Sequence, residues 1–449
     1  MKQRYALIIL PFLAGLLAAG CRGVPVAGEK SARRDAAAVA RQLSPPPELK
    51  SGASLAEEVA YALRTQPQVA AAYADWAASI EQITVERSLP DPKLTFEFYL
   101  ADTITSLMPG LAMEVPGPGK LQARGALATA ASRVKYFQFQ TVVLQTALAV
   151  EKTFYPLHYL DERLRVNRQT LALLTGLETL ARTQDEVGKA TLQDVLRAQI
   201  EQEKLRTETA NLEDSRAVLM AQFKAALGLS QARPDPPVPT TAGLVDNGTN
   251  DAIQYETALR QNPELRELAA DIAVAEAQLA VARKDRIPDF SAGGEADVKA
   301  SPVVWNPQFS MTLPVWRDKL AAERAAAQDN RRAAQARWAA GQIALAADFA
   351  EQSYDLRAAE RDLALLRERL LPRARQALAA AQTAYSSGQT DFLNVIEAER
   401  ARLNFQLDEI DAQARRALAR AELQLLVAGV PPPTAPLLQE PPATTIPKP

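Results

Sequence analysis

The chain has a single cysteine and a single histidine among its 449 residues. A lone cysteine cannot form a disulfide within the chain, and one histidine cannot by itself supply the nitrogen and sulfur ligands of a zinc site. That histidine, His158, lies in a helical run, where a structural role is the commoner one. A glycine-rich phosphate loop and a nucleophile elbow are also absent. We therefore expect that the protein is not an enzyme and that it has neither a metal site nor a cofactor.

The chain also has no excess of one charge sign and no long apolar run. The 51 Lys and Arg residues are matched by 53 Asp and Glu residues, which gives a formal net charge of −2. This balance offers no basic surface, so we expect no nucleic-acid partner. Beyond the N-terminus, no apolar run reaches the roughly 18 residues of a transmembrane helix. Any membrane span would therefore have to consist of strands.

The first twenty residues have the pattern of a secretory signal peptide. Lys2 and Arg4 provide the positive start, and residues 5–17 form a short apolar core. The stretch that ends at Cys21 resembles a bacterial lipobox, in which the cysteine becomes the acylated first residue of the mature protein. Arg22 follows, where an aspartate would indicate retention in the inner membrane. The resemblance therefore implies a lipid anchor at Cys21 in the outer membrane; an ordinary cleavage site with an incidental cysteine is the alternative.

The body of the chain contains an internal duplication. Four short motifs recur in the same order at offsets of about 196 to 201 residues, a period too long for a solenoid repeat. They indicate two copies of one architecture. The matched segments are 62–67 with 258–263, 89–91 with 287–289, 188–198 with 388–398, and 226–228 with 427–429.

These features divide the chain into six segments. The signal peptide is followed by an acylated tether, two repeats joined by a linker, and a Pro-rich tail that we expect to be disordered. The expected segments are 1–20 for the signal, 21–50 for the tether, 51–230 for repeat 1, 231–251 for the linker, 252–430 for repeat 2 and 431–449 for the tail.

One region of each repeat alternates between apolar and polar residues, as strands do. The two regions, at about 93–115 and 289–313, each predict one hairpin, so the chain offers four strands. One face carries Phe and Leu, which fits lipid on that side and water on the other. A soluble hairpin with one buried face would alternate in the same way. The opposite face carries the acids Glu97, Glu114, Glu295 and Asp297.

Four strands cannot close a barrel, and an open sheet edge in lipid leaves backbone groups unpaired. The eight strands of a dimer would enclose only side chains, whereas the twelve strands of a trimer leave room for a pore. We therefore predict a mostly α protein with a small membrane β-barrel that is completed in a homotrimer.

Very long helices follow each pair of strands. The expected helices span 120–186, 191–227, 316–386 and 391–427. The first is about 100 Å long at 1.5 Å per residue, so these helices are expected to pair as antiparallel coiled coils and to wall a tube. Pro156 and Pro372 lie inside the runs and should kink or break them.

These residues resemble the TolC-type outer-membrane efflux family over about residues 51–430. The most specific segments are 188–196 and 388–396, where a glycine is followed six to eight residues later by an Asp-Val-Leu or Asn-Val-Ile sequence. Residues 114–120 look closest to the heavy-metal branch of that family. The resemblance implies a trimer with a twelve-stranded barrel and a helical tunnel through the periplasm.

The resemblance also implies roles for individual residues. Gly188 and Gly388 correspond to turns at the closed periplasmic tip, where a periplasmic adaptor protein docks, although plain helix caps would use glycine in the same way. A like-charged ring around a narrow pore selects cations, whereas most acids on coiled coils are merely solvated. The expected gate or pore-lining residues are Asp194, Tyr385, Asp391, Asn394 and Glu397.

The function that we expect is a passive outer-membrane channel in a tripartite, RND-type efflux system. An inner-membrane pump would supply the energy, and the cargo would be small molecules, drugs or metal cations. Two alternatives remain open at this stage. One is an outer-membrane channel for type I protein secretion, and the other is a structural periplasmic coiled-coil lipoprotein without a pore.

Overall fold

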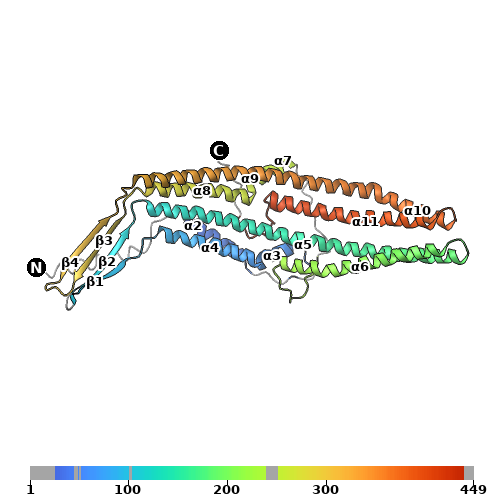
Figure 1. Cartoon of the computed structure of the whole chain (residues 1–449), viewed down its shortest axis with the longest axis horizontal. Coiled ribbons are helices and arrows are strands. Elements are labelled where there is room, and N and C mark those ends of the chain that lie inside the picture. The colour runs from blue at the N-terminus through green and yellow to red at the C-terminus, as the bar shows by residue number, and fades with distance from the viewer. Residues whose placement is uncertain (1–25, 45–48, 50–51, 101–103, 239–250, 439–449) are drawn as a thin grey trace. The chain divides into compact units, whose positions relative to one another are not determined.

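The computed structural model describes residues 26–44, 49, 52–100, 104–238 and 251–438 (Figure 1). The expected signal peptide and Cys21 lie outside the described residues, as does most of the tail. The chain forms two compact units. The first combines residues up to 41 with 71–139 and 263–342, and the second combines 42–70, 140–262 and the residues from 343 onward.

Helices dominate, and the described strands form one four-stranded antiparallel sheet, which confirms the expected fold class at this level. The same order of elements occurs twice. The first series is α3 (Leu55–Thr65), α4 (Pro67–Arg87), β1 (Lys93–Leu100), β2 (Ile104–Val115), α5 (Lys120–Glu186) and α6 (Leu192–Ala226). The second is α7 (Asp251–Gln261), α8 (Pro263–Lys284), β3 (Phe290–Asp297), β4 (Val304–Met311), α9 (Arg317–Leu365), the π-helical η1 (Leu366–Leu370), α10 (Leu371–Ser386), α11 (Phe392–Ala421) and the π-helical η2 (Glu422–Val427).

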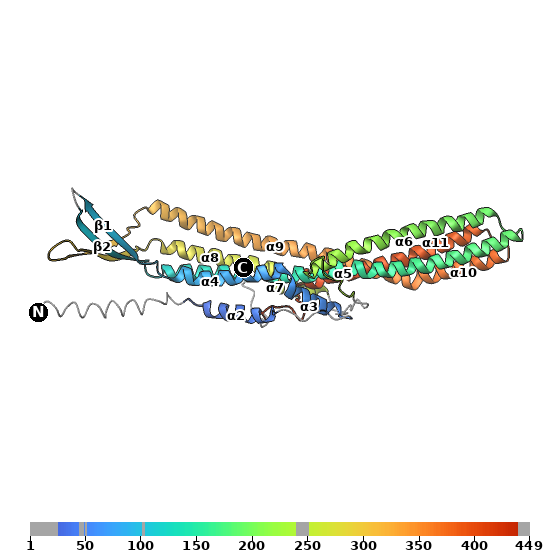
Figure 2. The same ribbon diagram turned by 90° about the horizontal axis from the view of Figure 1, so that it is seen from below.

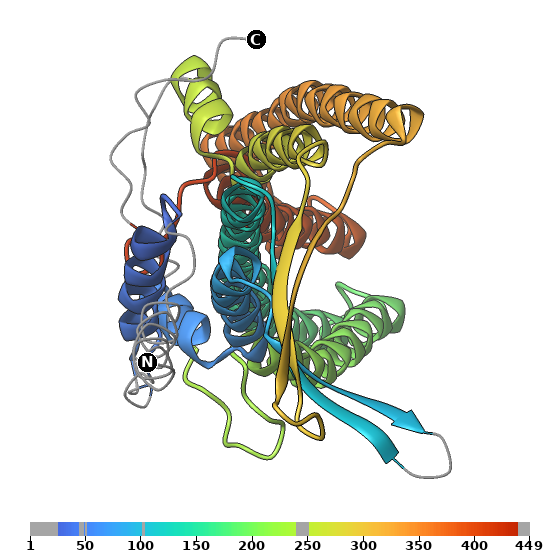
Figure 3. The same cartoon turned by 90° about the vertical axis from the view of Figure 1, so that its left-hand side faces the viewer.

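The sheet belongs to the first unit, and its strands follow the order β1-β2-β3-β4, so that β1 and β4 form the two edges (Figure 3). Each strand alternates, which sorts apolar side chains onto one face. Phe309 is 81% exposed and Phe96 is 56% exposed. An apolar face this large and this exposed marks a surface for lipid or for a partner. Its large exposed members are Leu94, Phe96, Phe98, Leu111, Val115, Phe290, Trp305, Phe309 and Met311.

The opposite face of the sheet is polar and internally bonded. Lys93 forms an ion pair with Glu114 at 2.6 Å. The hydroxyl of Ser106 donates to Asp297 at 2.7 Å, and the hydroxyls of Ser291 and Ser310 lie 2.7 Å apart. The predicted separation of apolar and acidic faces is therefore confirmed. No helix in the described part of the chain has both the length and the apolar character needed to cross a bilayer.

An ion pair between the two repeats fixes the junction of sheet and helix. Asp289, just before β3, accepts hydrogen bonds from the backbone N–H of Gly117 and from Lys120, each at 2.8 Å. The Lys120 side chain is only 7% exposed. Burial opposes ionisation of Asp289, but the Lys120 and Gly117 hydrogen bonds outweigh it and hold the pKa of Asp289 below its ordinary value. This contribution to stability is present at neutral pH and is lost as the pH falls through that lowered pKa.

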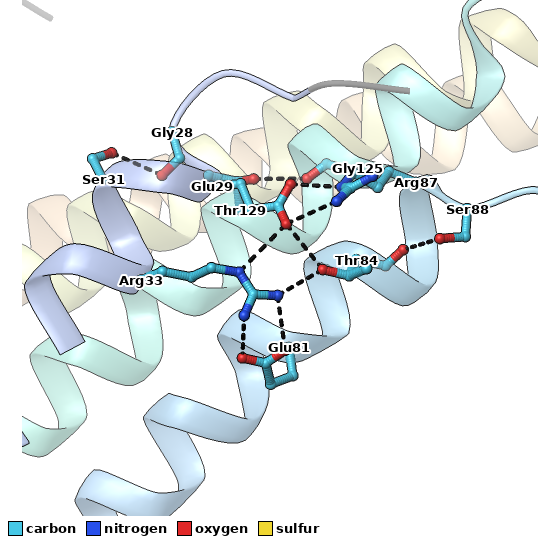
Figure 4. A network of polar contacts seen from close by, with 10 residues as sticks. All are labelled: Gly28, Glu29, Ser31, Arg33, Glu81, Thr84, Arg87, Ser88, Gly125 and Thr129. Carbon is cyan, nitrogen blue, oxygen red and sulfur yellow. Dashed lines mark hydrogen bonds and ion pairs between the residues drawn. The ribbon is translucent and has the colours of Figure 1, made fainter. Parts of the chain in front are cut away.

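Part of the expected tether is helix α2 (Glu29–Gln42), which is held against α4. Figure 4 shows the reason. Glu29 accepts hydrogen bonds from Arg87 and Thr84 of α4, and Arg33 is paired with Glu81. Charge-assisted bonds of this kind are about twice as strong as neutral ones. The bond with Arg87, above all, lowers the pKa of Glu29.

Gly125 of α5 leaves room for this N-terminal segment. A Cβ at Gly125 would lie 2.5 Å from Cγ2 of Val26 and 3.1 Å from Cβ of Arg87. Glycine therefore lets the chain before α2 approach α5 closely. A short Ala- and Arg-rich segment gives little sign of this contact by itself, because the partners lie some 50 to 100 residues away in the sequence.

In the second unit, each repeat has an equivalent hydrogen-bonded contact at the end of its last helix. The side-chain amide of Gln66 donates to the carbonyls of Ala225 and Ala226 at the end of α6. The amide of Asn262 donates in the same way to Leu426 and Val427 at the end of η2. Each amide residue precedes the proline that begins the next helix, so both repeats satisfy the carbonyls of a helix end with the same device.

The two prolines in the long helices have different outcomes. Helix α5 continues through Pro156 without interruption, so the expected break does not occur there. Pro372 lies in the first turn of α10, directly after the π-helical η1. A proline removes one N–H donor and crowds the preceding turn, and the wider π-turn accommodates it. The prediction of an interruption is therefore confirmed at Pro372.

Two glycines with the same backbone conformation should respond differently to substitution. Gly429 has φ +65°, and a Cβ there would lie 2.7 Å from Cα of Asn262. Gly388 has φ +73°, with open space where a Cβ would lie. Gly388→Ala should cost only the left-handed backbone term of about 1–2 kcal/mol, whereas Gly429→Ala should also incur an overpacking cost of about 1–3 kcal/mol. Thermal unfolding of the two variants measures the difference, and equal melting temperatures would contradict the packing around Asn262.

Candidate functional site: the tips of the two helical hairpins

The tip region lies in the second unit and consists of two helical hairpins. The end of α5 and the start of α6 form the first, and α10 and α11 form the second; Figure 2 shows the four helices side by side. One apolar cluster holds the hairpins together. It contains Leu174, Leu177, Ala181, Val195, Ala198 and Leu205 of the first hairpin with Leu378, Tyr385, Phe392, Val395 and Ile396 of the second.

Gly188 forms the first turn. Its φ is +69°, and its N–H donates to the carbonyl of Asp185 at 2.9 Å. The next N–H, of Lys189, reaches back to Gln184 at 2.8 Å. Backward bonds of this kind around a left-handed residue end a helix and satisfy its last carbonyls. The sequence signal at Gly188 therefore has a local structural cause.

Gly388 forms the second turn with the same geometry. Its φ is +73°, its N–H donates to Tyr385 at 3.0 Å, and Gln389 donates to Ala384 at 2.8 Å. A Cβ at either glycine would meet nothing within 4 Å. Both turns therefore present open backbone, and a side chain added there would point into solvent or into a partner.

Asp194 holds the start of α6. Its carboxylate accepts from the backbone N–H and from the hydroxyl of Thr191, each at 3.2 Å. Arg197 lies 3.7 Å away on the same helix. These contacts form the reciprocal arrangement of a capping box. The geometry gives Asp194 a role in its own helix, whatever else it does.

Tyr385 is buried in the apolar cluster. It is 6% exposed, and its ring centroid lies 5.2 Å from that of Phe392. Burial raises the pKa of Tyr385, and the nearby carboxylates of Asp194 and Asp185 raise it further. Within the described residues its hydroxyl has no hydrogen-bond partner. The structure therefore places Tyr385 between the hairpins and away from the exposed surface.

Asp391, Asn394 and Glu397 lie on one exposed face of the first turns of α11. Asp391 is the N-cap residue of that helix, but its side chain makes no capping bond. The side-chain amide of Asn394 donates to the hydroxyl of Thr390 at 2.6 Å. The structure therefore brings these three predicted residues together and separates them from Asp194 and Tyr385, whose side chains have structural partners or packing.

Two polar contacts of acidic residues, one between the hairpins and one within the first hairpin, were not found from the sequence. Arg400 of α11 binds Glu201 of α6 through two hydrogen bonds, one of them 3.0 Å long. Glu178 of α5 accepts from Gln199 at 2.8 Å and from Gln202 at 2.9 Å, and these bonds, above all, lower its pKa. In the sequence, such a glutamate looks like any other solvent-exposed acid of a coiled coil. Only the packing of the helices identifies its partner.

Part of α6 is left uncovered. Leu192, Leu196 and Ile200 follow each other at helical spacing and are about half exposed or more. Leu196 and Ile200 line an open groove of about 790 Å³ together with Gln199, Glu203, Lys204, Thr207, Glu208 and Asn211. Among the described residues, no group of three or more His, Cys, Asp or Glu side chains is arranged to hold a metal ion.

Comparison with known proteins gives a family match over part of the chain and a fold. Residues 254–429 match the model of the outer membrane efflux protein family. The comparison with curated protein sequences gives no match.

Several solved outer-membrane proteins have a similar structure. The protein VceC of Vibrio cholerae is 16% identical with a TM-score of 0.69, over 83% of this chain and 96% of that one. The CmeC outer membrane channel of Campylobacter jejuni is 14% identical with a TM-score of 0.69, over 86% and 90%. CusC, whose structures concern transmembrane channel formation, is 15% identical with a TM-score of 0.69, over 85% and 96%. Residues 254–429 thus resemble the outer membrane efflux protein family, and the chain has the fold of these solved proteins.

Proposed function

We propose that this chain is the outer-membrane channel subunit of a tripartite efflux system, a passive conduit that works as a homotrimer. The observation that carries this proposal is the sheet. One of its faces is apolar and exposed, its other face is polar, and β1 and β4 have one neighbouring strand each. A surface of this kind suits lipid on one side and water on the other. Three copies would supply twelve strands, enough to enclose a pore.

The remaining parts of the proposal are based on the family match and on the geometry of the hairpin tips. Lipidation at Cys21 would anchor the chain in the outer membrane. The open turns at Gly188 and Gly388 would contact a periplasmic adaptor, and an inner-membrane pump would deliver the cargo. The local geometry of both turns supports such contacts, because added side chains there meet no atom of the chain itself.

The acids at the start of α11 are the best candidates for a selective constriction. Asp391, Asn394 and Glu397 share one exposed face, and three copies would bring three such faces together around an axis. Repeated like charges at close range favour cations in the pore. Tyr385 is proposed to act differently, by holding the two hairpins of one copy together.

Replacing Asp391 and Glu397 by Ala should lower the preference for cations without dissociating the trimer, because the side chains are exposed and carry negative charge. The measurement is the reversal potential of the purified protein in a planar bilayer under a salt gradient. Glu351→Ala, an exposed acid on α9, is the matched control and should change nothing. Unchanged selectivity in the double variant would contradict the pore-lining role. An absence of conductance in every gating variant would contradict the channel itself.

The two faces of β4 provide a test of membrane insertion. Phe309→Lys would place a charge on the apolar face, at a cost of about 2–4 kcal/mol near the bilayer midplane. Gln308→Lys changes the neighbouring residue on the polar face and should be tolerated. The measurement is the fraction of each variant that co-sediments with outer membranes after alkaline washing. If both variants remain membrane-bound to the same extent, the apolar face does not contact lipid and a soluble spacer is favoured.

Tyr385→Phe should leave stability unchanged or raise it slightly, because it removes a buried hydroxyl without a partner. Tyr385→Ala should cost about 3–5 kcal/mol, since it empties the site of a large buried ring. Melting temperatures of the two variants measure these effects, with channel conductance recorded in parallel. Altered conductance in Tyr385→Phe at unchanged stability would show that the hydroxyl acts in gating.

A further inference from the structure

Exposed cations gather where the second hairpin of the sheet joins its two helices. Residues 283–288, from the end of α8, and residues 316–324, at the start of α9, contain six Lys and Arg against three acids. All six cations are exposed and belong to the first unit. We refer to them as the junction cations: Arg283, Lys284, Arg286, Arg317, Lys319 and Arg324.

The junction cations have few partners of opposite charge. Lys319 lies 3.8 Å from Glu323, and the guanidinium of Arg324 donates to a carbonyl of its own helix at 3.1 Å. The other four form no ion pair within the described residues. The two remaining acids of these segments are Asp285 and Asp318. An excess of positive charge is therefore left at this junction.

The internal repeat allows this junction to be compared with that of the first hairpin. Phe96 pairs with Pro109 in the first hairpin, and the residues 198 positions later pair in the second. The two hairpins thus share one register, and positions at their ends can be compared directly. The same shift relates the two basic segments to residues 85–90 and 118–126.

The first junction has no comparable excess. Its equivalent positions contain only three cations. Arg87 is bound by Glu29 of α2, and Lys120 is buried in its ion pair with Asp289. Arg124 alone remains exposed. The accumulation of free cations is therefore a property of the second junction, and the plan of the repeat does not account for it.

The apolar face of the sheet leads directly to these cations. Phe309 of β4 lies on that face, and apolar residues recur at every second position past the strand, at Leu313 and Val315. Leu313, Val315 and Trp316 are 61%, 62% and 74% exposed. Arg317 follows immediately. An apolar surface that ends in an aromatic and then a basic side chain is typical of the boundary between membrane and water.

The fold brings the two basic segments to one place. The backbone N–H of Thr312, after β4, donates to the carbonyl of Asp289, before β3, at 2.8 Å. The chain therefore enters and leaves the hairpin at neighbouring points, and Figures 1 and 2 show α8 and α9 leaving the sheet side by side. Arg317 and Arg324 are two turns apart, so they lie on the same side of α9.

We propose that the junction cations and Trp316 bind the head groups of anionic phospholipids in the membrane leaflet next to the helices. This inference rests on the proposed function, in which the sheet lies in lipid and the helices extend into the periplasm. Guanidinium groups bind phosphate oxygens through paired, charge-assisted hydrogen bonds. A free anion would match the cations only, whereas a phospholipid also matches the exposed apolar side chains before Arg317.

Charge gives this site a preference among lipids. Each Lys or Arg close to an anionic membrane surface strengthens the attraction roughly fivefold, and salt screens it. A zwitterionic lipid carries the same phosphate without net charge. We therefore expect phosphatidylglycerol to be enriched around Trp316 several-fold over phosphatidylcholine, and we expect about 1 M salt to remove most of this enrichment.

Quenching of Trp316 by brominated lipids measures the preference. The full-length protein is reconstituted in phosphatidylcholine vesicles that contain a small fraction of phosphatidylglycerol or phosphatidylcholine brominated near the head group. Because the chain has four tryptophans, the difference between the wild type and Trp316→Phe isolates the signal of Trp316. Half-maximal quenching should need several-fold less brominated phosphatidylglycerol than brominated phosphatidylcholine.

Charge variants assign the preference to the junction. A triple Gln variant should be quenched equally by the two lipids, whereas the triple Lys variant at the same positions should keep the preference, because it keeps the charge. The replaced residues are Arg283, Arg286 and Arg317. The matched control replaces three exposed cations of the second unit by Gln and should behave as the wild type; these are Arg361, Arg373 and Arg375. A preference that survives in the triple Gln variant, or is lost in the control, would overturn the assignment.

The outcomes in the wild type separate this inference from the proposed function. Equal quenching by the two lipids would overturn the anionic-lipid site and leave the channel proposal in place, since lipid would still reach Trp316. If inorganic phosphate removes the preference and chloride at the same ionic strength does not, the site takes free anions and the lipid assignment is wrong. If neither brominated lipid quenches Trp316, the sheet does not lie in the bilayer and the proposed function itself is overturned.

Discussion

The unpaired edges of the four-stranded sheet are the constraint on which the rest of this structure depends. Each edge strand carries a row of backbone donors and acceptors, and one face of the sheet is apolar and exposed. Such an edge cannot remain open in lipid, since each unpaired group costs several kcal/mol there. Proteins that keep edges in water usually blunt them with charges, whereas β4 carries Trp305 and Phe309 on its outer face. In the proposed trimer, strands of neighbouring copies would cover these edges.

Duplication relates the two halves of the structure. The contact between β2 and β3 joins the repeats, and the two hairpins share one register. Within the chain, the ion pair of Asp289 and Lys120 fixes the junction between the repeats. At the other end of each repeat, Gln66 and Asn262 show that equivalent helix ends are also closed in the same way.

The candidate gate divides into two groups when packing is considered. Asp194 caps its helix and Tyr385 packs between the hairpins, so each has a structural role of its own. Asp391, Asn394 and Glu397 have exposed side chains and share a face, so they remain available for a pore. A sequence motif contains both kinds of residue, because the turn, the cap and the exposed acids lie within a few positions of each other.

The sequence by itself determined the fold class, the two repeats, the strand regions and most of the ends of the long helices, because these depend on local periodicity and on proline and glycine. It could not identify α2 within the expected tether, since Glu29 and Arg87 are 58 residues apart and only folding brings them together. It also could not separate the buried Tyr385 from the exposed Glu397, or pair Glu201 with Arg400. Those distinctions depend on which face of each helix is covered, and the tertiary packing alone decides that.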